Sequence, residues 1–117
     1  MLDDRFLQQL KKGVLEMLVL ETVCEGATYG YALLTKLKTR SAGLFTLKEG
    51  TLYPILYRLE DEGMICASWS AGEGRSAPKK MYAATEKGRT ERSRQKLLWR
   101  EFAQTVDAFY IPDTQEE

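Results

Sequence analysis

The chain has 117 residues, of which 44% are hydrophobic, and its 17 Lys and Arg balance 17 Asp and Glu with no histidine. This length and composition are typical of one globular domain and exclude a disordered tail. The missing histidine excludes Ser-His-Asp and Cys-His catalysis, and the two cysteines, Cys24 and Cys66, have no cysteine partner at metal-ligand spacing. We therefore expect no enzyme activity, no metal and no cofactor. Because the chain has no long apolar run and no signal-like N-terminus, we expect a cytoplasmic protein that does not enter a membrane.

The zero net charge hides a strong asymmetry along the chain. Residues 1–74 carry eight basic and ten acidic side chains, residues 75–100 carry nine basic and two acidic ones, and residues 101–117 carry five acidic ones and no basic one. Clustered cations of this kind are the electrostatic footprint of nucleic-acid binding. For residues 86–100 alone, a solvated helix face with charge pairs one turn apart is the alternative interpretation.

Two helices are predicted in the N-terminal part of the chain. The first covers about residues 4–23, where apolar residues recur at three- and four-residue spacing; they are Phe6, Leu7, Leu10, Val14, Met17, Leu18 and Val23. Gly26 is expected to end this helix in a left-handed cap, and Thr28 to cap a second helix over about residues 29–40. Residues 44–47 are expected to form a short strand or an extended link.

The third helix is predicted over residues 48–63, where Leu52, Ile55, Leu56 and Leu59 form one apolar face. Pro54 lies inside this helix, but Gly50, four residues earlier, leaves room for its ring. The period then changes and predicts a strand over residues 64–69, a flexible loop over 70–78 and a returning strand over 79–84. Thr85 is expected to cap a long fourth helix over residues 86–110, followed by an acidic tail over 111–117.

Three helices followed by a strand, a loop and a second strand predict a winged helix-turn-helix. The expected fold is mostly α-helical with a small β-hairpin: residues 1–85 form the DNA-binding domain, residues 86–110 a dimerisation helix and residues 111–117 the tail. The first helix also dimerises, because neither it nor the fourth helix can bury its apolar stripe inside one short chain. A two-fold dimer predicts an inverted-repeat site in double-stranded DNA. The expected DNA-contacting residues lie on the third helix and the wing; they are Lys48, Thr51, Tyr53, Tyr57, Arg58, Arg75, Lys79 and Lys80.

Several of these side chains have a second interpretation. Tyr53 and Tyr57 either contact phosphate through their hydroxyls or pack their rings on the core. Arg58 is expected to pair with Glu62 in the free protein and with phosphate in the complex. A winged helix that binds proteins rather than DNA is the alternative function, but such a module does not need cations on both helix and wing.

The sequence resembles the PadR family of bacterial transcriptional regulators. The resemblance rests on Gly50-Thr51-Leu52-Tyr53-Pro54, on Arg58-Leu59-Glu60 and Gly63-Met64-Ile65, on Tyr29-Gly30-Tyr31, and on residues 80–88, Lys-Met-Tyr-Ala-Ala-Thr-Glu-Lys-Gly. It implies a homodimeric repressor. Met81 and Ala84 depart from the family pattern, in which an aromatic residue and a leucine are usual, and weaken local wing packing without removing a cation.

The length of the chain places the resemblance with the subfamily that has a single C-terminal helix. Some of its members resemble multidrug sensors that hold flat apolar ligands at the dimer centre, between tryptophans of the two fourth helices. Trp99 matches that position, and Phe102 and Val106 lie on the same side of the helix. The resemblance therefore implies an aromatic effector that binds there by stacking. The alternative is a closed seam in which these side chains only pack.

Overall fold

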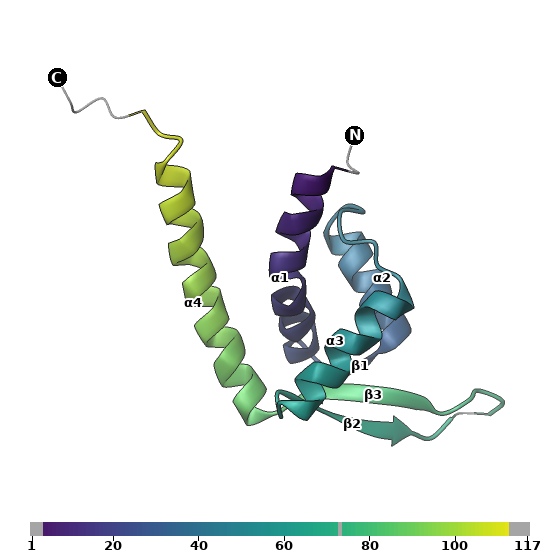
Figure 1. Ribbon diagram of the computed structural model, residues 1–117. Helices are drawn as coiled ribbons and strands as arrows, with labels where there is room; N and C mark the ends of the chain where they lie inside the picture. Colours follow the sequence, from purple (N-terminus) through teal and green to yellow (C-terminus); the bar gives the residue numbers. More distant parts are fainter. Residues whose placement is uncertain (1–3, 73, 113–117) are drawn as a thin grey trace.

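The computed structural model describes residues 4–72 and 74–112 and has four helices and a small antiparallel sheet, in the order α1, β1, α2, α3, β2, β3, α4 (Figure 1). The expected class, mostly helical with a β-hairpin wing and a long C-terminal helix, is confirmed. Among the described residues, no helix combines the length and the apolar character needed to cross a membrane.

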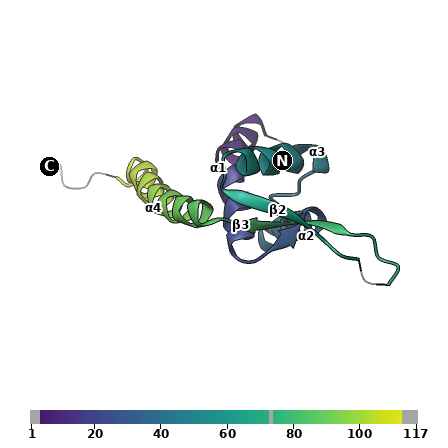
Figure 2. The ribbon, with the colours of Figure 1, turned by 90° about the horizontal axis from the view of Figure 1, so that it is seen from below.

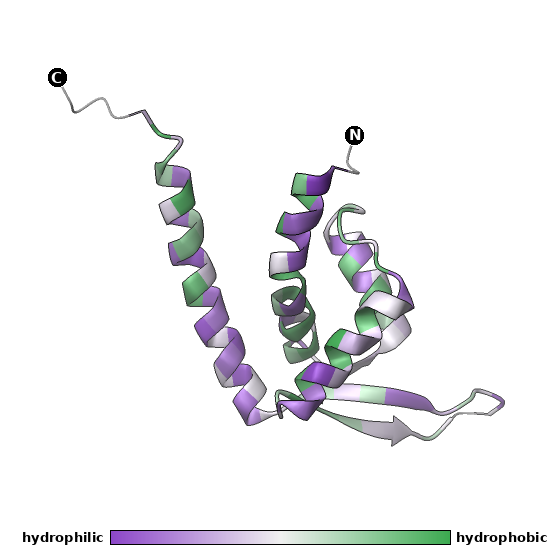
Figure 3. Cartoon of the chain, viewed as in Figure 1, coloured by the Kyte–Doolittle hydropathy of each residue, from purple (hydrophilic) through white to green (hydrophobic). Residues whose placement is uncertain are grey.

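The core lies where α1 (Arg5–Cys24), α2 (Gly30–Arg40) and α3 (Glu49–Asp61) meet the sheet. Each helix turns an apolar face toward this core. Figure 3 shows the lower half of α1, close to the sheet, in green. The buried apolar side chains are Leu15, Val19, Leu20, Val23, Leu33, Leu37, Phe45, Leu52, Ile55, Leu56, Leu59, Ile65 and Tyr82.

Helix α1 buries the expected stripe only in part, since Val14 and Leu18 are partly buried against the core. Of the predicted stripe, only Val23 is fully buried, and Phe6 and Leu10 are 65% and 52% exposed. The core instead takes Leu15, Val19 and Leu20. Periodicity alone could not choose between the two faces because α1 is apolar on both of them, and only the tertiary packing determines which face is covered.

The second helix does not begin with a Thr28 cap. Thr28–Tyr29 form the short strand β1, which pairs antiparallel with β3 in the register Thr28 to Tyr82 and Tyr29 to Met81. Tyr29 therefore occupies the N-cap position of α2 and makes no side-chain cap hydrogen bond. Gly26 has φ +158°, which is close to extended and not left-handed, so the expected left-handed cap is absent at this residue. At the end of α1, the amides of Glu25 and Gly26 donate hydrogen bonds to the carbonyls of Thr22 and Val23.

The third helix and the wing agree closely with the expectation. α3 keeps Pro54 inside it and begins after Lys48, and the hairpin consists of β2 (Ile65–Ser70) and β3 (Lys79–Ala84). The sheet has three strands in the order β1-β3-β2, because β1 adds to the free edge of β3. Residues 44–47 lie in a turn and an irregular link rather than a strand.

Helix α4 (Glu86–Ala108) projects from the end of β3 and leaves the body of the molecule (Figures 1 and 2). Thr85 caps it as expected: its Oγ1 accepts a hydrogen bond from the Gly88 amide. The helix ends two residues before the predicted Tyr110. Most of the expected acidic tail, residues 113–117, lies outside the described residues.

Candidate DNA-binding surface

The third helix separates its apolar and polar residues cleanly. Leu52, Ile55, Leu56 and Leu59 face the core, whereas Lys48, Thr51, Tyr57 and Arg58 are exposed. Pro54 lies in the second turn of the helix, where its missing N–H costs the hydrogen bond to the carbonyl of Gly50. One flank of this helix is therefore free to enter a groove of DNA.

Tyr53 lies between the core and the surface. Its half-buried ring packs against the core, and its hydroxyl lies beside Gly30, at the start of α2. A side chain at position 30 would collide with this hydroxyl, so the two residues fit only because position 30 is glycine. The more exposed Tyr57 lies one turn further along α3, and the two ring centroids are 6.0 Å apart.

The two lysines of the wing strand lie against aromatic rings. Lys79 Nζ is 4.5 Å from the ring centroid of Tyr29, and Lys80 Nζ is 5.4 Å from that of Tyr57 and 5.5 Å from that of Tyr82. Lys80 Nζ also lies 3.9 Å from a carboxylate oxygen of Glu60. The contacts with Tyr57 and Glu60 place Lys80 of the wing beside α3. Arg75 is exposed near the tip of the hairpin.

Arg58 pairs with a residue that the sequence did not suggest. Its guanidinium donates to Glu16 of α1 at 2.8 and 3.2 Å, and this hydrogen bond raises the pKa of Arg58 above its usual value. The expected ion pair with Glu62 is therefore wrong. Glu16 is 42 positions away in sequence, and only the packing of α1 across α3 brings the two side chains together.

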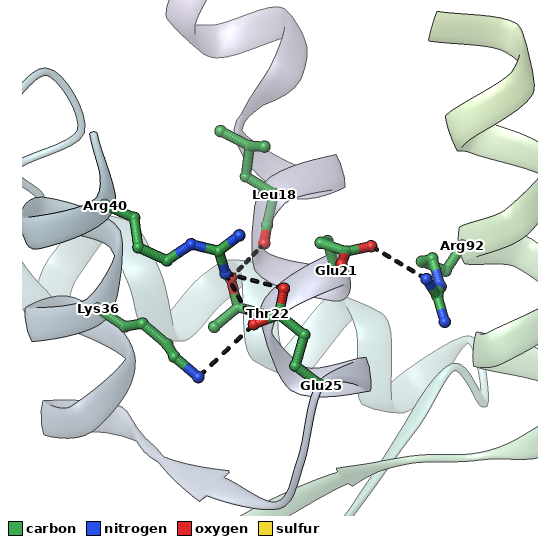
Figure 4. Close-up of polar contacts among 7 residues, drawn as sticks. All are labelled: Leu18, Glu21, Thr22, Glu25, Lys36, Arg40 and Arg92. Atoms are coloured by element: carbon green, nitrogen blue, oxygen red, sulfur yellow. Dashed lines mark hydrogen bonds and ion pairs between the residues drawn. The ribbon is translucent and has the colours of Figure 1, made fainter. Parts of the chain in front are cut away.

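A second group of charges links α1 to its neighbours (Figure 4). Glu25 binds Arg40 at 2.7 Å and Lys36 at 3.6 Å, and Glu21 lies 3.5 Å from Arg92 of α4. The hydrogen bond from Arg40, aided by Lys36, lowers the pKa of Glu25. These contacts link α2 and α4 to α1, so Lys36 and Arg40 of α2 are paired within the protein.

The residues expected to bind an effector lie on the part of α4 that leaves the body. Trp99, Phe102 and Val106 are 43%, 64% and 39% exposed, and the rings of Trp99 and Phe102 are 6.4 Å apart. Within one chain these three side chains share one face of α4 and are open to solvent.

No three histidine, cysteine, aspartate or glutamate side chains gather at metal-binding distance within residues 4–72 and 74–112. Cys24 is half-buried, with its thiol 3.9 Å from the carbonyl oxygen of Gly88, and burial raises its pKa. Cys66 is exposed on the wing, and the two cysteines are not bonded to each other.

Fold and surface together define a winged helix-turn-helix with a long C-terminal helix. The transcriptional regulator PadR-like family model matches residues 19–94, and the chain belongs to this family. A PadR-family regulator from Eggerthella lenta is similar over 92% of this chain and 91% of its own, with a TM-score of 0.80 and 30% identity. A PadR-like regulator from Bacillus cereus is similar over 90% of this chain and 99% of its own, with a TM-score of 0.77 and 30% identity.

A third solved structure contains a ligand. It is PadR of Bacillus subtilis in complex with operator DNA. The similarity covers 70% of this chain and 46% of the Bacillus subtilis chain, with a TM-score of 0.62 and 29% identity.

Proposed function

We propose that this chain is a homodimeric repressor that binds an inverted-repeat operator through α3 and the wing and is released by a flat aromatic effector. One observation carries the DNA-binding part: Lys80 of the wing lies against Tyr57 and Glu60 of α3, so the wing lies beside the exposed side of this helix. The operator complex of the Bacillus subtilis relative supports the same assignment. Such a regulator acts in the cytoplasm, where bacterial DNA lies.

The alternative, a winged helix that binds another protein, predicts no salt-dependent binding to DNA. The first experiment measures binding of the wild-type chain to the DNA around its own promoter, by mobility shift and by fluorescence anisotropy at several salt concentrations. A DNA-binding surface gives a steep loss of affinity with salt, because each neutralised phosphate adds about 0.9 to the slope of log affinity against log salt. Absence of a specific complex at low salt overturns the proposal.

Single residues of the surface are tested in the same assay. Lys48→Ala and Lys79→Ala remove one cation per chain, from the helix start and from the wing, so each removes two from the dimer. Both are expected to weaken binding to every sequence and to lower the salt slope by about two. The double change Lys79→Ala, Lys80→Ala extends the test to the cation nearest α3. Lys38→Ala, an exposed lysine at the end of α2, is the matched control. If Lys48→Ala and Lys79→Ala bind operator as the wild type does at every salt concentration, the assigned surface is wrong.

The homodimer is supported by the apolar side chains that one chain leaves uncovered. Phe6 and Leu10 on α1 and Phe102 and Val106 on α4 are exposed, and the two helices diverge (Figure 1). A second copy can cover both faces through a two-fold axis. On this proposal residues 86–110 dimerise together with the first helix, and residues 1–85 bind the DNA.

The effector is proposed to bind between the Trp99 indoles of the two chains, with Phe102 and Val106 as apolar walls. It relieves repression only if it binds more tightly to a dimer geometry that misplaces the two recognition helices. Tryptophan fluorescence tests this in a Trp69→Phe background, where the signal comes from Trp99 alone. We expect a panel of flat aromatic compounds to quench this emission and to lower operator affinity. If both stay unchanged, α4 only joins the two chains.

A further inference from the structure

A groove lies between the N-terminal half of α1 and the segment that leads into α3. Its volume is about 640 Å³, and Leu15, Phe45 and Leu47 provide its apolar part. The α1 residues that line it are spaced so that they share one face of the helix. This face differs from the one that carries Phe6 and Leu10, so a partner chain on that apolar face leaves the groove accessible.

The polar lining of the groove consists of cations and neutral hydrogen-bonding groups. Four basic side chains, two glutamines and two threonines line it, and no carboxylate does; the residues are Arg5, Lys11, Lys12, Lys48, Gln8, Gln9, Thr46 and Thr51. Within residues 4–72 and 74–112, none of the four basic side chains forms an ion pair. The groove therefore gathers cations whose charge the described part of the protein does not neutralise.

The groove is continuous with the recognition helix. Lys48 and Thr51 line it and also form the exposed start of α3. A DNA strand that contacts these two residues is thus already at the mouth of the groove. The phosphodiester backbone carries one negative charge per nucleotide and offers only acceptor oxygens, which suits a lining rich in donors and free of carboxylates.

We propose that the groove binds the sugar-phosphate backbone of operator DNA, and that Lys11 and Lys12 of α1 are phosphate contacts beyond the recognition helix and the wing. This inference rests on the proposed function, since it extends the same DNA-binding surface. It assigns to the first helix a part in DNA binding besides its part in the dimer. These contacts give affinity without sequence preference because every nucleotide carries the same phosphate.

The test compares the salt dependence of operator binding for Lys11→Gln, Lys12→Gln and the double variant with the wild type. Each variant removes two cations from the dimer and is expected to lower the slope of log affinity against log salt by about 1.8, and the double variant by about 3.6, on operator and unrelated DNA alike. Lys38→Gln removes the same charge from an exposed helix position outside the groove and is expected to leave the slope unchanged. Because Lys12 is exposed, its replacement leaves the core intact, and thermal unfolding of each variant verifies this.

A second measurement locates the contact on the DNA. Single phosphates of the operator are replaced by neutral methylphosphonates, and binding is measured for the wild type and for the double variant. At the phosphates held by the groove, the replacement is expected to weaken wild-type binding and to leave the double variant unaffected. Equal losses for both proteins at every position overturn the inference.

The remaining outcomes separate the two proposals. In one outcome, the wild type binds its operator, Lys48→Ala weakens this binding, and the Lys11 and Lys12 variants keep the wild-type salt slope. The groove is then not a site for the DNA backbone, and the proposed function stands. If inorganic phosphate at constant ionic strength raises the melting temperature of the wild type but not of the double variant, and the DNA slopes are equal, the groove binds a free anion and the inference is overturned. If the wild type forms no DNA complex, the proposed function itself fails.

Discussion

Tyr82 is the largest fully buried side chain of the fold, and its hydroxyl is unusual. Among the residues that the structure describes, the hydroxyl has no hydrogen-bond partner. Burial, reinforced by the neighbouring Tyr57 and Tyr53, raises the pKa of Tyr82 to about 12 from its ordinary value near 10. The ring of Tyr82 therefore stabilises the fold by packing in the core, whereas its buried hydroxyl reduces the free energy of unfolding.

Replacing Tyr82 by phenylalanine is expected to keep or increase the free energy of unfolding at neutral pH, by up to about 1 kcal/mol, because an unsatisfied buried hydroxyl is removed. The raised pKa also fixes the sign of the pH dependence. The unfolded chain loses this proton near pH 10 and the folded one near pH 12, so wild-type stability falls as the pH rises through this window. The Tyr82→Phe variant is expected to lose less of its free energy of unfolding than the wild type over this pH range.

Urea unfolding between pH 7 and about pH 11 measures both effects, since ordinary tyrosines titrate near 10. Tyr31→Phe, which changes a residue that is 73% exposed, serves as the control and is expected to follow the wild type. A loss of 1 kcal/mol or more for Tyr82→Phe at pH 7, about the value of one satisfied hydrogen bond, would show that the hydroxyl has a partner.

Gly88 sets how closely α4 can approach the wing. It is buried in the first turn of α4, and a Cβ at this position would collide with the backbone carbonyl oxygen of Met64. Gly88→Ala is therefore expected to reduce the free energy of unfolding by about 1–3 kcal/mol, since neither backbone can move aside easily. Gly50→Ala is the matched control: nothing lies within 4 Å of its Cβ position, and the change is expected to add about 0.5–1 kcal/mol. Equal effects of the two changes, read from denaturant unfolding, would contradict the packing at Gly88.

At the scale of elements, the pair between Glu16 of α1 and Arg58 of α3 links stability to DNA binding. The pair is solvent-exposed and contributes little to folding, but it holds a predicted phosphate contact in place. In the complex, Arg58 would exchange a carboxylate for a phosphate. The first helix therefore competes with DNA for this side chain.

Glu16→Gln is expected to tighten operator binding several-fold, because it frees Arg58 and removes a negative charge near the backbone. Arg58→Ala is expected to weaken binding, and in that background Glu16→Gln should keep only its small general charge effect. Anisotropy titrations of the two single variants and the double variant measure the coupling. If Glu16→Gln tightens binding equally with and without Arg58, the two residues act independently and Arg58 is not held back by Glu16.

At the scale of the whole molecule, the outstanding feature is a 23-residue helix that has only Gly88 fully buried. A helix of this kind has a stable apolar face only when another surface covers it. The molecule is accordingly extended, with principal dimensions of 72 × 35 × 20 Å. The homodimer proposed above supplies the missing surface.

Phe102→Glu is expected to weaken self-association by about 2 kcal/mol or more, roughly thirtyfold, because it places a charge in the centre of the proposed interface. It should leave each chain folded, since Phe102 is 64% exposed. Gln104→Glu adds the same charge on the opposite side of α4 and is the control. Light scattering over a range of concentrations measures the effect. A wild type that is a monomer at micromolar concentration would contradict the dimer.

The sequence by itself predicted those parts of the protein whose causes are local. The stripe of Leu52, Ile55, Leu56 and Leu59, the Thr85 cap and the change of period at the wing all depend on residues close together in the chain. Helix caps and helical faces are properties of a few consecutive residues, so α3, the hairpin and α4 were correct to within about two residues. Most of the family motifs lie in these same segments, whereas Tyr29-Gly30-Tyr31 lies in β1 and α2.

Only the tertiary structure decided which surfaces meet. It selected the face of α1 that is buried, made Thr28 part of a strand by pairing it with Tyr82, and gave Arg58 to Glu16 instead of Glu62. It also gathered Lys11, Lys12 and Lys48 into one groove. Each of these outcomes joins residues that are distant in sequence, and no local preference encodes such a contact. The packing of the helices on the sheet therefore determined the shape of the candidate DNA surface, while the sequence determined which chemical groups were available to form it.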